Sequence, residues 1–225
     1  MQEIILIKYG ELILKGLNKS TFENAMEKNL KRVLKSAGNF SVLKSQSTVT
    51  VTPLDDYCDI ESAVKKIGKV FGIAAYSRAC VCEQNMDDIT SKAIEYLPSY
   101  LSSAKTFKVE AKRSDKNFPL TSPQISAQIG GVILANFKGI KVDVHNPDVT
   151  VTVEIRDKSA YIRAGQIKGA GGLPVSTAGN AGILISGGID SPVAAWMIAK
   201  RGVKLYAFHF ASPPYTSPRA ELKVR

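Results

Sequence analysis

The stretch AGILISGGIDSPVAAWMIAKRGVKLYAFHF, residues 181–210, carries the strongest structural signal in the chain. Two short apolar runs flank a glycine turn and an apolar segment of helical length, which predicts a strand, a turn, a helix and a second strand. The runs are continuously apolar, as buried strands of a parallel sheet are. A parallel sheet needs more strands than these and helices on both faces. We therefore expect residues 179–225 to be the incomplete start of a Rossmann-like α/β domain, and the sequence to be a fragment of a longer protein.

The turn SGGIDS, residues 186–191, predicts an anion-binding loop. Glycines let backbone N–H groups approach phosphate oxygens, and the helix that we expect to begin at Pro192 adds a positive dipole. Ser186 and Ser191 supply hydroxyl donors. Because phosphates would repel Asp190 unless a cation bridges them, we expect this carboxylate to meet Mg²⁺ through a bound nucleotide. The alternative is a glycine-rich turn with no ligand.

Several protein classes are excluded or disfavoured by the sequence. The turn lacks both the Gly-Lys-Ser/Thr of a P-loop and the G-x-G-x-x-G of a dinucleotide site. No window reaches the roughly 18 apolar residues of a membrane span, and the opening MQEIILIKYG predicts a strand and not a signal peptide. Cys58, Cys80 and Cys82 suit a reducing cytoplasm better than a disulfide framework. We expect a cytoplasmic protein without a membrane partner, in which Cys80 and Cys82 serve packing and not sulfur chemistry.

The net charge suggests a polyanionic partner. Among 225 residues, 30 are basic and 20 are acidic, which gives a formal net charge of +10. Residues 61–166 carry 15 basic and 11 acidic residues, and residues 167–225 carry 7 and 2. Such a balance favours nucleic acid, and a soluble protein that is merely basic is the alternative. A hydrophobic fraction of 44% and a charged fraction of 22% exclude collagen, a coiled coil and wholesale disorder.

Residues 1–166 predict a mixture of helices and strands. Ser122 is the expected N-cap of one helix, with Pro123 as its first helical residue. The segment that follows these elements is rich in glycine and small residues, and is the best candidate linker. The predicted helices are 18–38, 60–73, 88–101 and 122–137, and the predicted strands are 2–12, 41–54, 74–83, 107–113 and a hairpin at 149–165.

Three motifs resemble the tRNA 4-thiouridine synthetase (tRNA sulfurtransferase) family of the PP-loop ATP pyrophosphatase superfamily, and the likeness runs through essentially the whole chain. Ser176 departs from the pattern, since the family usually has glycine there. The motifs are KYGELILKGLNKSTFENAMEKNL (8–30), EAKRSDKNFPLTSPQISAQIGGVIL (110–134) and GAGGLPVSTAGNAGILISGGIDSPVAAWMIAKRG (169–202). The resemblance implies α+β modules followed by an α/β domain. They are a ferredoxin-like domain at 1–60, a THUMP RNA-binding domain at 61–166, a Gly-rich linker at 167–178 and the N-terminal part of a PP-loop domain at 179–225.

The same resemblance implies an ATP-dependent tRNA sulfurtransferase. In the family, ATP adenylates O4 of a uridine at position eight of tRNA. Sulfur from a persulfide donor, such as a cysteine desulfurase, then displaces AMP and leaves 4-thiouridine. The family also provides sulfur for thiamine thiazole formation and forms homodimers. Its sulfur-carrying cysteine belongs to a later region or to an added rhodanese domain, so we do not expect this stretch alone to be a complete enzyme.

The resemblance also implies site residues. Asp190 and Ser191 are the expected catalytic residues, and Asp190 is the expected metal contact through Mg-ATP. His209 and Phe210, at the end of the second strand, are expected beside the adenine, although His209 could equally end a strand with no contact. The expected ATP-binding residues are Leu184, Ile185, Ser186, Gly187, Gly188, Asp190, Ser191, His209 and Phe210.

A basic cluster in residues 108–116 predicts RNA contact. Its members are Lys108, Lys112, Arg113 and Lys116, with Lys8 and Lys15 as weaker candidates. Such side chains would give salt-sensitive contacts to phosphates that do not depend on sequence. The alternative is a solvated strand edge, because alternation puts Lys108 and Lys112 on one water-facing side.

Two other functions stay open at this stage. One is a different PP-loop ATP-dependent synthetase, of the NAD- or GMP-forming kind, although such an enzyme needs no long basic module before the loop. The other is a catalytically inert RNA-binding THUMP protein.

Overall fold

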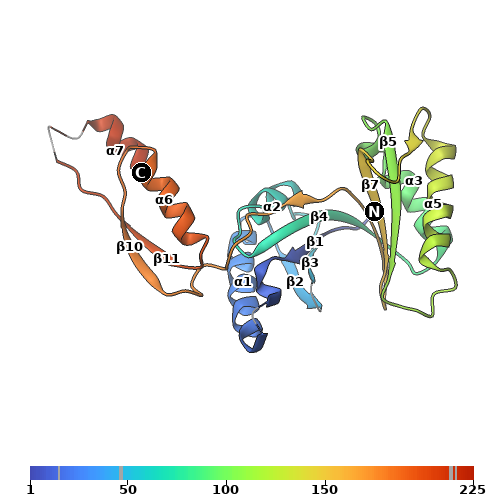
Figure 1. Ribbon diagram of the computed structural model, residues 1–225, viewed down its shortest axis with the longest axis horizontal. Coiled ribbons are helices and arrows are strands. Elements are labelled where there is room, and N and C mark those ends of the chain that lie inside the picture. The colour runs from blue at the N-terminus through green and yellow to red at the C-terminus, as the bar shows by residue number, and fades with distance from the viewer. Residues whose placement is uncertain (15, 46–47, 213–214, 216) are drawn as a thin grey trace. The chain divides into compact units, whose positions relative to one another are not determined.

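A computed structural model describes residues 1–14, 16–45, 48–212, 215 and 217–225 (Figure 1). These residues form two compact units, and β1 (Glu3–Tyr9) and β4 (Ile73–Cys82) contribute residues to both. The first unit comprises Met1–Leu6, Thr50–Pro53 and Ser77–Ile167, and the second comprises Ile7–Val49, Leu54–Tyr76 and Lys168–Arg225.

The N-terminal part of the chain alternates strands and helices. Helix α1 (Lys19–Leu34) buries Met26, Leu30 and Leu34, which lie on one face because they are four residues apart. That helix packs against α2 (Ile60–Ile67), which ends several residues before the predicted limit at residue 73. The remaining elements of this part are the 3₁₀ helices η1 (Glu11–Leu14) and η2 (Gly16–Asn18) and the hairpin strands β2 (Phe40–Ser45) and β3 (Thr48–Pro53).

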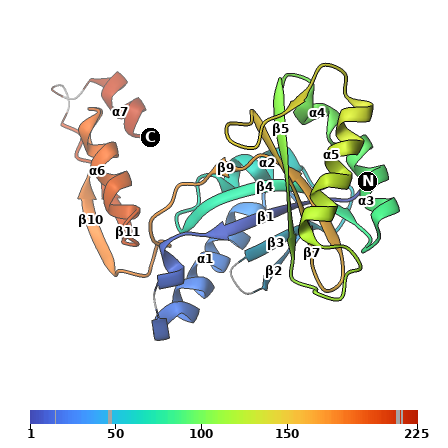
Figure 2. The ribbon, with the colours of Figure 1, turned by 45° about the vertical axis from the view of Figure 1, so that its right-hand side comes forward.

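The middle of the chain places two helices on one face of a sheet. Helices α3 and α5 lie beside β5 and β7 (Figure 2). Strand β5 pairs in parallel with β7, and β7 pairs antiparallel with β8, with Val153 opposite both Ala111 and Ile162. The elements are α3 (Met86–Tyr96), α4 (Pro98–Leu101), β5 (Thr106–Arg113), α5 (Ser122–Asn136), β6 (Lys141–Val142), β7 (Val149–Ile155), β8 (Ala160–Ala164) and β9 (Ile167–Lys168). The described strands through β8 are hydrogen-bonded in the order β2-β3-β1-β4-β8-β7-β5-β6, and β9 pairs with β4.

The cap of α5 differs from the prediction. Thr121, and not Ser122, is the N-cap residue, and its backbone N–H donates to Oε1 of Gln124 at 2.8 Å. This reciprocal capping box satisfies an N–H that the helix itself cannot. Ser122 is therefore the first residue of the helix, and Pro123 occupies the next position, where a missing N–H is tolerated.

A hydrophobic core fills the space between α3, α5 and the sheet. Alternation along each strand and the i, i+4 spacing in α5 direct these side chains to one layer. Removal of this apolar surface from water is the main stabilising contribution to this part of the fold. Its fully buried members include Ile89, Phe107, Ile125, Ile129, Ile133, Val151, Val153, Ile155 and Ile162.

The C-terminal part has the predicted strand, turn, helix and strand. Strands β10 (Asn180–Leu184) and β11 (Lys204–Phe208) are parallel, and α6 (Asp190–Ala199) connects them. Helix α6 begins at Asp190, two residues before the predicted start, so Asp190 and Ser191 lie in its first turn. A last helix, α7, spans Pro218–Val224. The α+β modules followed by the start of a parallel sheet confirm the predicted fold class.

The glycine-rich segment before β10 is held by backbone hydrogen bonds. Gly169 and Gly171 donate N–H to the carbonyl oxygens of Ala74 and Ile73, at 2.9 Å and 2.8 Å. Thr177 and Ala178 both donate to the carbonyl oxygen of Gly202, at 3.0 Å. The segment is thus positioned by specific bonds, while its extent as a linker, 167–178, stays a prediction. No helix among the described residues is both long and apolar enough to cross a membrane.

Candidate nucleotide site

The turn between β10 and α6 is closed by its two serines. Ser186 donates its backbone N–H to Oγ of Ser191 at 3.1 Å, and Gly188 donates its N–H to Oγ of Ser186 at 3.4 Å. The two hydroxyls lie 3.3 Å apart. Side chains five residues apart therefore meet across the turn, which fixes the path of the backbone between them.

Gly187 is required by a close approach of the chain. A Cβ added at this residue would lie 3.1 Å from both Cα and the carbonyl oxygen of Ala220 in α7. At Gly188 the nearest atom would be Oγ of Ser186, at 3.4 Å. The first glycine of the pair thus admits α7 next to the turn, and the second meets only a side chain that can rotate.

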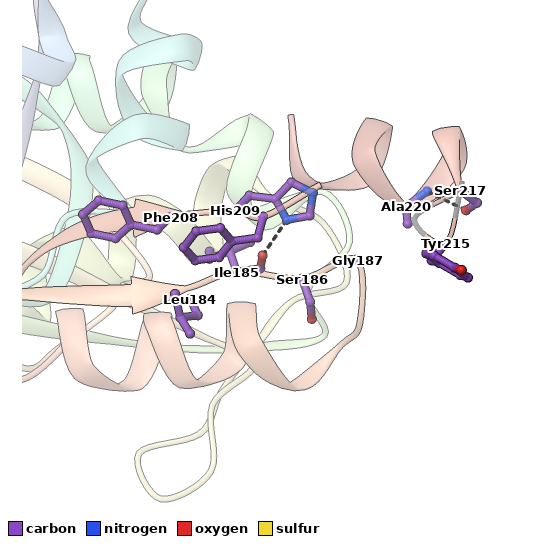
Figure 3. A pocket seen from close by; sticks show the side chains of 10 residues that line it. Leu184, Ile185, Ser186, Gly187, Phe208, His209, Tyr215, Ser217 and Ala220 are labelled. Atoms are coloured by element: carbon purple, nitrogen blue, oxygen red, sulfur yellow. Dashed lines mark hydrogen bonds between the residues drawn. The ribbon is translucent and has the colours of Figure 1, made fainter. Parts of the chain in front are cut away.

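A cavity of about 590 Å³ opens beside this turn (Figure 3). Six of the predicted ATP-binding residues line it: Leu184, Ile185, Ser186, Gly187, His209 and Phe210. They meet because parallel strands β10 and β11 end at the same edge, where Ile185 donates its N–H to the carbonyl oxygen of Phe208 at 2.8 Å. Sequence reasoning missed Phe208, Tyr215, Ser217 and Ala220, which complete the lining.

His209 has a defined orientation and one unused nitrogen. Its Nδ1 lies 2.8 Å from the carbonyl oxygen of Ile185, drawn as a dashed line in Figure 3. Because a carbonyl oxygen only accepts, Nδ1 carries a proton, and Nε2 of the neutral ring is then an acceptor. Nε2 is shielded from solvent and has no hydrogen-bond partner among the described residues. Such an atom favours a ligand that brings a hydrogen-bond donor.

Asp190 does not line this cavity. Its side chain is exposed in the first turn of α6 and borders a separate hollow of about 300 Å³ with Ile189, Val193, Ala194 and Met197. No group of three or more potential metal ligands occurs among the described residues. A single carboxylate nevertheless fits Mg²⁺, because that ion is usually held by one or two carboxylates, substrate phosphates and water.

The predicted RNA-binding residues do not form one cluster. Lys108 and Lys112 share one face of β5, and Nζ of Lys108 pairs with Oε1 of Glu110 at 2.6 Å. This hydrogen bond and charge lower the pKa of Glu110, because they favour its ionised form. Arg113 lies on the opposite face, where its Nη1 donates to the carbonyl oxygens of Phe118 and Leu120 at 3.1 Å and 2.8 Å. Lys116 is exposed in the loop that Arg113 braces.

The remaining predicted residues lie in different environments. Lys8 belongs to β1, and Lys15 lies outside the described residues. Cys80 and Cys82 are buried on β4, and a hydrogen bond with Cys80, together with burial, raises the pKa of the Cys82 thiol. Cys58 donates its thiol to the carbonyl oxygen of Asn39 at 3.0 Å. A packing role for Cys80 and Cys82 stays a prediction that their burial supports.

Comparison with known protein families gives a consistent result along the chain. Residues 4–77 match a family described as the ThiI ferredoxin-like domain, residues 83–163 match the THUMP domain, and residues 176–225 match the thiamine biosynthesis protein ThiI. The chain is thus similar to ThiI at both ends, with a THUMP domain between them. One curated relative, from Caldanaerobacter subterraneus subsp. tengcongensis, is named "Probable tRNA sulfurtransferase" and is 49% identical over 224 residues. The chain spans 57% of that relative's length.

Two solved structures resemble all or nearly all of this chain. The first is described as a 4-thiouridine synthetase–RNA complex with bound ATP, and it is 34% identical with a TM-score of 0.87. The match covers 100% of this chain and 56% of the length of that chain. The second is PH1313 from Pyrococcus horikoshii, with 26% identity and a TM-score of 0.83, and covers 98% of this chain and 72% of its own.

Proposed function

We propose that this chain supplies the tRNA-binding modules and the ATP-binding loop of an ATP-dependent tRNA sulfurtransferase. The reaction replaces O4 of a uridine in tRNA, at position eight, with sulfur to give 4-thiouridine. The observation that carries the proposal is the serine-closed SGGIDS turn beside the cavity at the carboxyl ends of β10 and β11. This edge is where open α/β sheets bind their ligands.

The geometry supports a division of the site into two parts. The cavity, with Phe208 and Phe210 on its wall and Nε2 of His209 unpaired, suits an adenine ring that offers both a flat apolar surface and an amino donor. The turn and the first residues of α6 suit the phosphates, because backbone N–H groups and the helix dipole favour negative charge. Asp190 would then meet Mg²⁺ on the phosphate side.

The chemistry follows from the poor leaving ability of a carbonyl oxygen. Attack of O4 on the α-phosphorus of ATP releases pyrophosphate and converts O4 into part of an adenylate. The outer sulfur of a persulfide, charged by a donor such as a cysteine desulfurase, then attacks C4 and displaces AMP. A second thiol attacks the S–S bond of the resulting adduct, which releases 4-thiouridine and leaves a disulfide that an external dithiol reduces. Ser191 and Asp190 act on the phosphates, and the sulfur comes from outside the described residues. A homodimer, sulfur supply for thiamine thiazole formation and a location in the cytoplasm are parts of the same proposal.

The test is Asp190→Asn in the 225-residue chain. We expect the variant to lose at least tenfold in affinity for Mg-ATP by isothermal titration calorimetry. Affinity for tRNA should stay within twofold. Asp157→Asn, which removes the same charge from the exposed turn between β7 and β8, is the matched control and should change neither.

Three outcomes would contradict the proposal. Equal loss of ATP and tRNA binding in Asp190→Asn would remove the division of roles. Binding of tRNA by the unaltered chain with no measurable binding of Mg-ATP would indicate an inert RNA-binding protein. Binding of ATP with no affinity for tRNA would indicate another ATP-dependent synthetase.

A further inference from the structure

A second cavity, of about 830 Å³, lies along α1 within the same compact unit. We call it the α1 groove. It shares no lining residue with the nucleotide cavity, and nothing in the proposed reaction uses it. Its lining consists of Asn24, Ala25, Glu27, Lys28, Asn29, Lys31 and Arg32 of α1, the C-cap residue Lys35, and Val175, Ser176 and Lys204.

The groove is built by contacts between distant parts of the sequence. Nδ2 of Asn29 donates to the carbonyl oxygen of Val175 at 3.1 Å, which ties the segment before β10 to α1. The same segment is turned by Ser176, whose φ of 78° lies in the left-handed region. Figures 1 and 2 show this part of the chain passing α1 on its way to β10. Lys204, at the start of β11, thereby joins the basic residues of α1.

The charge of the groove is strongly one-sided. Five of its lining residues are basic, and Glu27 is the acidic one. Glu27 is already paired, with Nζ of Lys31 at 2.7 Å and Nζ of Lys44 at 3.0 Å. Lys28, Arg32, Lys35 and Lys204 are exposed and make no ion pair among the described residues. Four cations thus face one groove whose single lining carboxylate, among the described residues, is already paired with Lys31 and Lys44.

The spacing of these cations suits an extended polyanion. Lys28, Arg32 and the C-cap residue Lys35 are at positions i, i+4 and i+7, and Lys35 keeps helical backbone angles. The three therefore lie on one side of the helix and extend over about 10 Å of its axis. Apolar lining is limited to Ala25 and Val175, whereas the centre of a protein–protein interface is rich in apolar and aromatic side chains. Basic and amide side chains without an apolar centre are the composition that contacts phosphates and sugars.

We propose that the α1 groove binds the phosphate backbone of an RNA, at a place separate from the basic residues of β5. The inference rests on the proposed function in one respect, which is that the substrate is an RNA. It adds that residues of α1 and β11 hold one stretch of that RNA together. The RNA would thereby also bridge the N-terminal module and the strand that follows the SGGIDS helix.

The first experiment removes the cations of α1. Lys28→Gln, Arg32→Gln and Lys35→Gln are combined in the 225-residue chain, and affinity for an unmodified tRNA transcript is measured between about 50 and 200 mM salt. Each lost phosphate contact should reduce the slope of log K against log salt by about 0.7 to 0.9, so the triple variant should lose about 2 to 3. Affinity at the lowest salt should fall at least tenfold.

A matched control separates the groove from net charge. The control variant combines Lys65→Gln, Lys158→Gln and Lys223→Gln, which lie at exposed positions outside the groove. It lowers the net charge by the same amount as the α1 triple variant. We expect that variant to keep the slope of the unaltered chain to within 1. Circular dichroism and thermal unfolding should be alike in both triple variants, because all six side chains are exposed.

Lys204→Gln tests whether β11 belongs to the groove. We expect the single variant to reduce the salt slope by about 1 while leaving Mg-ATP affinity unchanged, since Lys204 does not line the nucleotide cavity. No change in slope for Lys204→Gln would confine RNA contact to α1 and overturn the joint groove.

The outcomes also separate this proposal from the proposed function. No tRNA binding by the unaltered chain would overturn both. Normal tRNA binding with an unchanged slope in the α1 triple variant would overturn the groove alone. Polyglutamate serves as a probe for an acidic protein partner. If the α1 triple variant binds tRNA as the unaltered chain does but no longer binds polyglutamate, the groove binds an acidic protein, and the proposal is likewise overturned.

Discussion

In the region from α3 to β8, Phe107, Ile129 and Val153 are fully removed from water, whereas α6 and its two flanking strands bury no side chain to that extent. The first region is positioned by side-chain packing. The second is held by backbone bonds to Gly202, by close approaches at Gly172 and Gly187, and by an edge-on contact of Trp196 with Phe71, whose ring centroids are 5.6 Å apart. Packed side chains give stability, while a turn of small residues leaves backbone groups within reach of a ligand.

The largest expected effect is on the packed region. Phe107→Ala removes a fully buried aromatic ring and should lower the free energy of unfolding by about 3 to 5 kcal/mol, because a cavity remains where the ring was. Met197→Ala, at a side chain 58% exposed on α6, should cost less than about 1 kcal/mol. Urea unfolding of both variants measures the difference. Equal costs would mean that the two regions do not differ in packing.

The second prediction concerns an ion pair in the packed region. Burial raises the pKa of Glu154, but hydrogen bonds and charge from Arg156 and Arg163 outweigh it, so the net effect is to lower that pKa. Glu154→Gln should cost about 3 kcal/mol at neutral pH, because it leaves the buried Arg163 guanidinium without a carboxylate.

The stability difference between Glu154→Gln and the unaltered chain should depend on pH. A carboxyl whose pKa is lowered by folding stabilises the protein above its ordinary value of 4.5, and this contribution is lost as the pH falls through the lowered value. The difference between Glu154→Gln and the unaltered chain should therefore shrink in acid. Thermal unfolding from pH 7 to pH 3 measures it, and a difference that grows in acid would contradict the assignment.

The third prediction tests backbone positioning in the C-terminal region. Gly171 and Gly172 have φ of 64° and 72°, so alanine is strained at either residue. At Gly172 the new Cβ would also lie 2.3 Å from the carbonyl oxygen of Lys200, whereas at Gly171 the nearest atom is 3.9 Å away. Gly172→Ala should cost at least about 2 kcal/mol more than Gly171→Ala.

Amide hydrogen exchange shows which part of the chain loses stability in Gly172→Ala. Amides of β10 and β11 should exchange faster in Gly172→Ala, while amides of β5 and β7 should keep their protection. If both sets change together, the two regions unfold as one unit and the comparison between them fails.

The smallest expected effect is a gain in stability. Ser176 has a φ of 78°, a conformation that costs a non-glycine residue about 1 kcal/mol. Ser176→Gly should therefore raise the free energy of unfolding by up to about 1 kcal/mol, partly offset by the greater freedom of glycine in the unfolded chain. Ser176→Ala keeps the strained backbone and should give no gain. Differential scanning calorimetry distinguishes the two variants.

Much of the nucleotide site could be predicted because it is local. The SGGIDS turn lies between an apolar strand and a helix, and parallel strands end at one edge, which brought His209 next to Ile185. Tyr215, Ser217 and Ala220 were missed because the chain after Phe210 has no periodic pattern to place it. Phe208 was missed because only the residues after the strand, His209 and Phe210, were expected beside the ligand. The basic cluster at 108–116 was misleading in one respect, since the two-residue period of β5 separates Arg113 from Lys112.

The sequence by itself determined the order of helices and strands, the parallel pair at the C-terminal end and the anion-binding turn. These depend on hydrophobic periodicity and on glycine and serine within a few residues of one another. Only the tertiary structure decided that Lys204 joins Lys28 and Arg32, and that Ser176 occupies a conformation suited to glycine. Residues 1–60 are nearly neutral as a composition, with 8 basic and 7 acidic residues. Folding creates the basic groove because it places Glu27 in ion pairs and brings distant cations to one face.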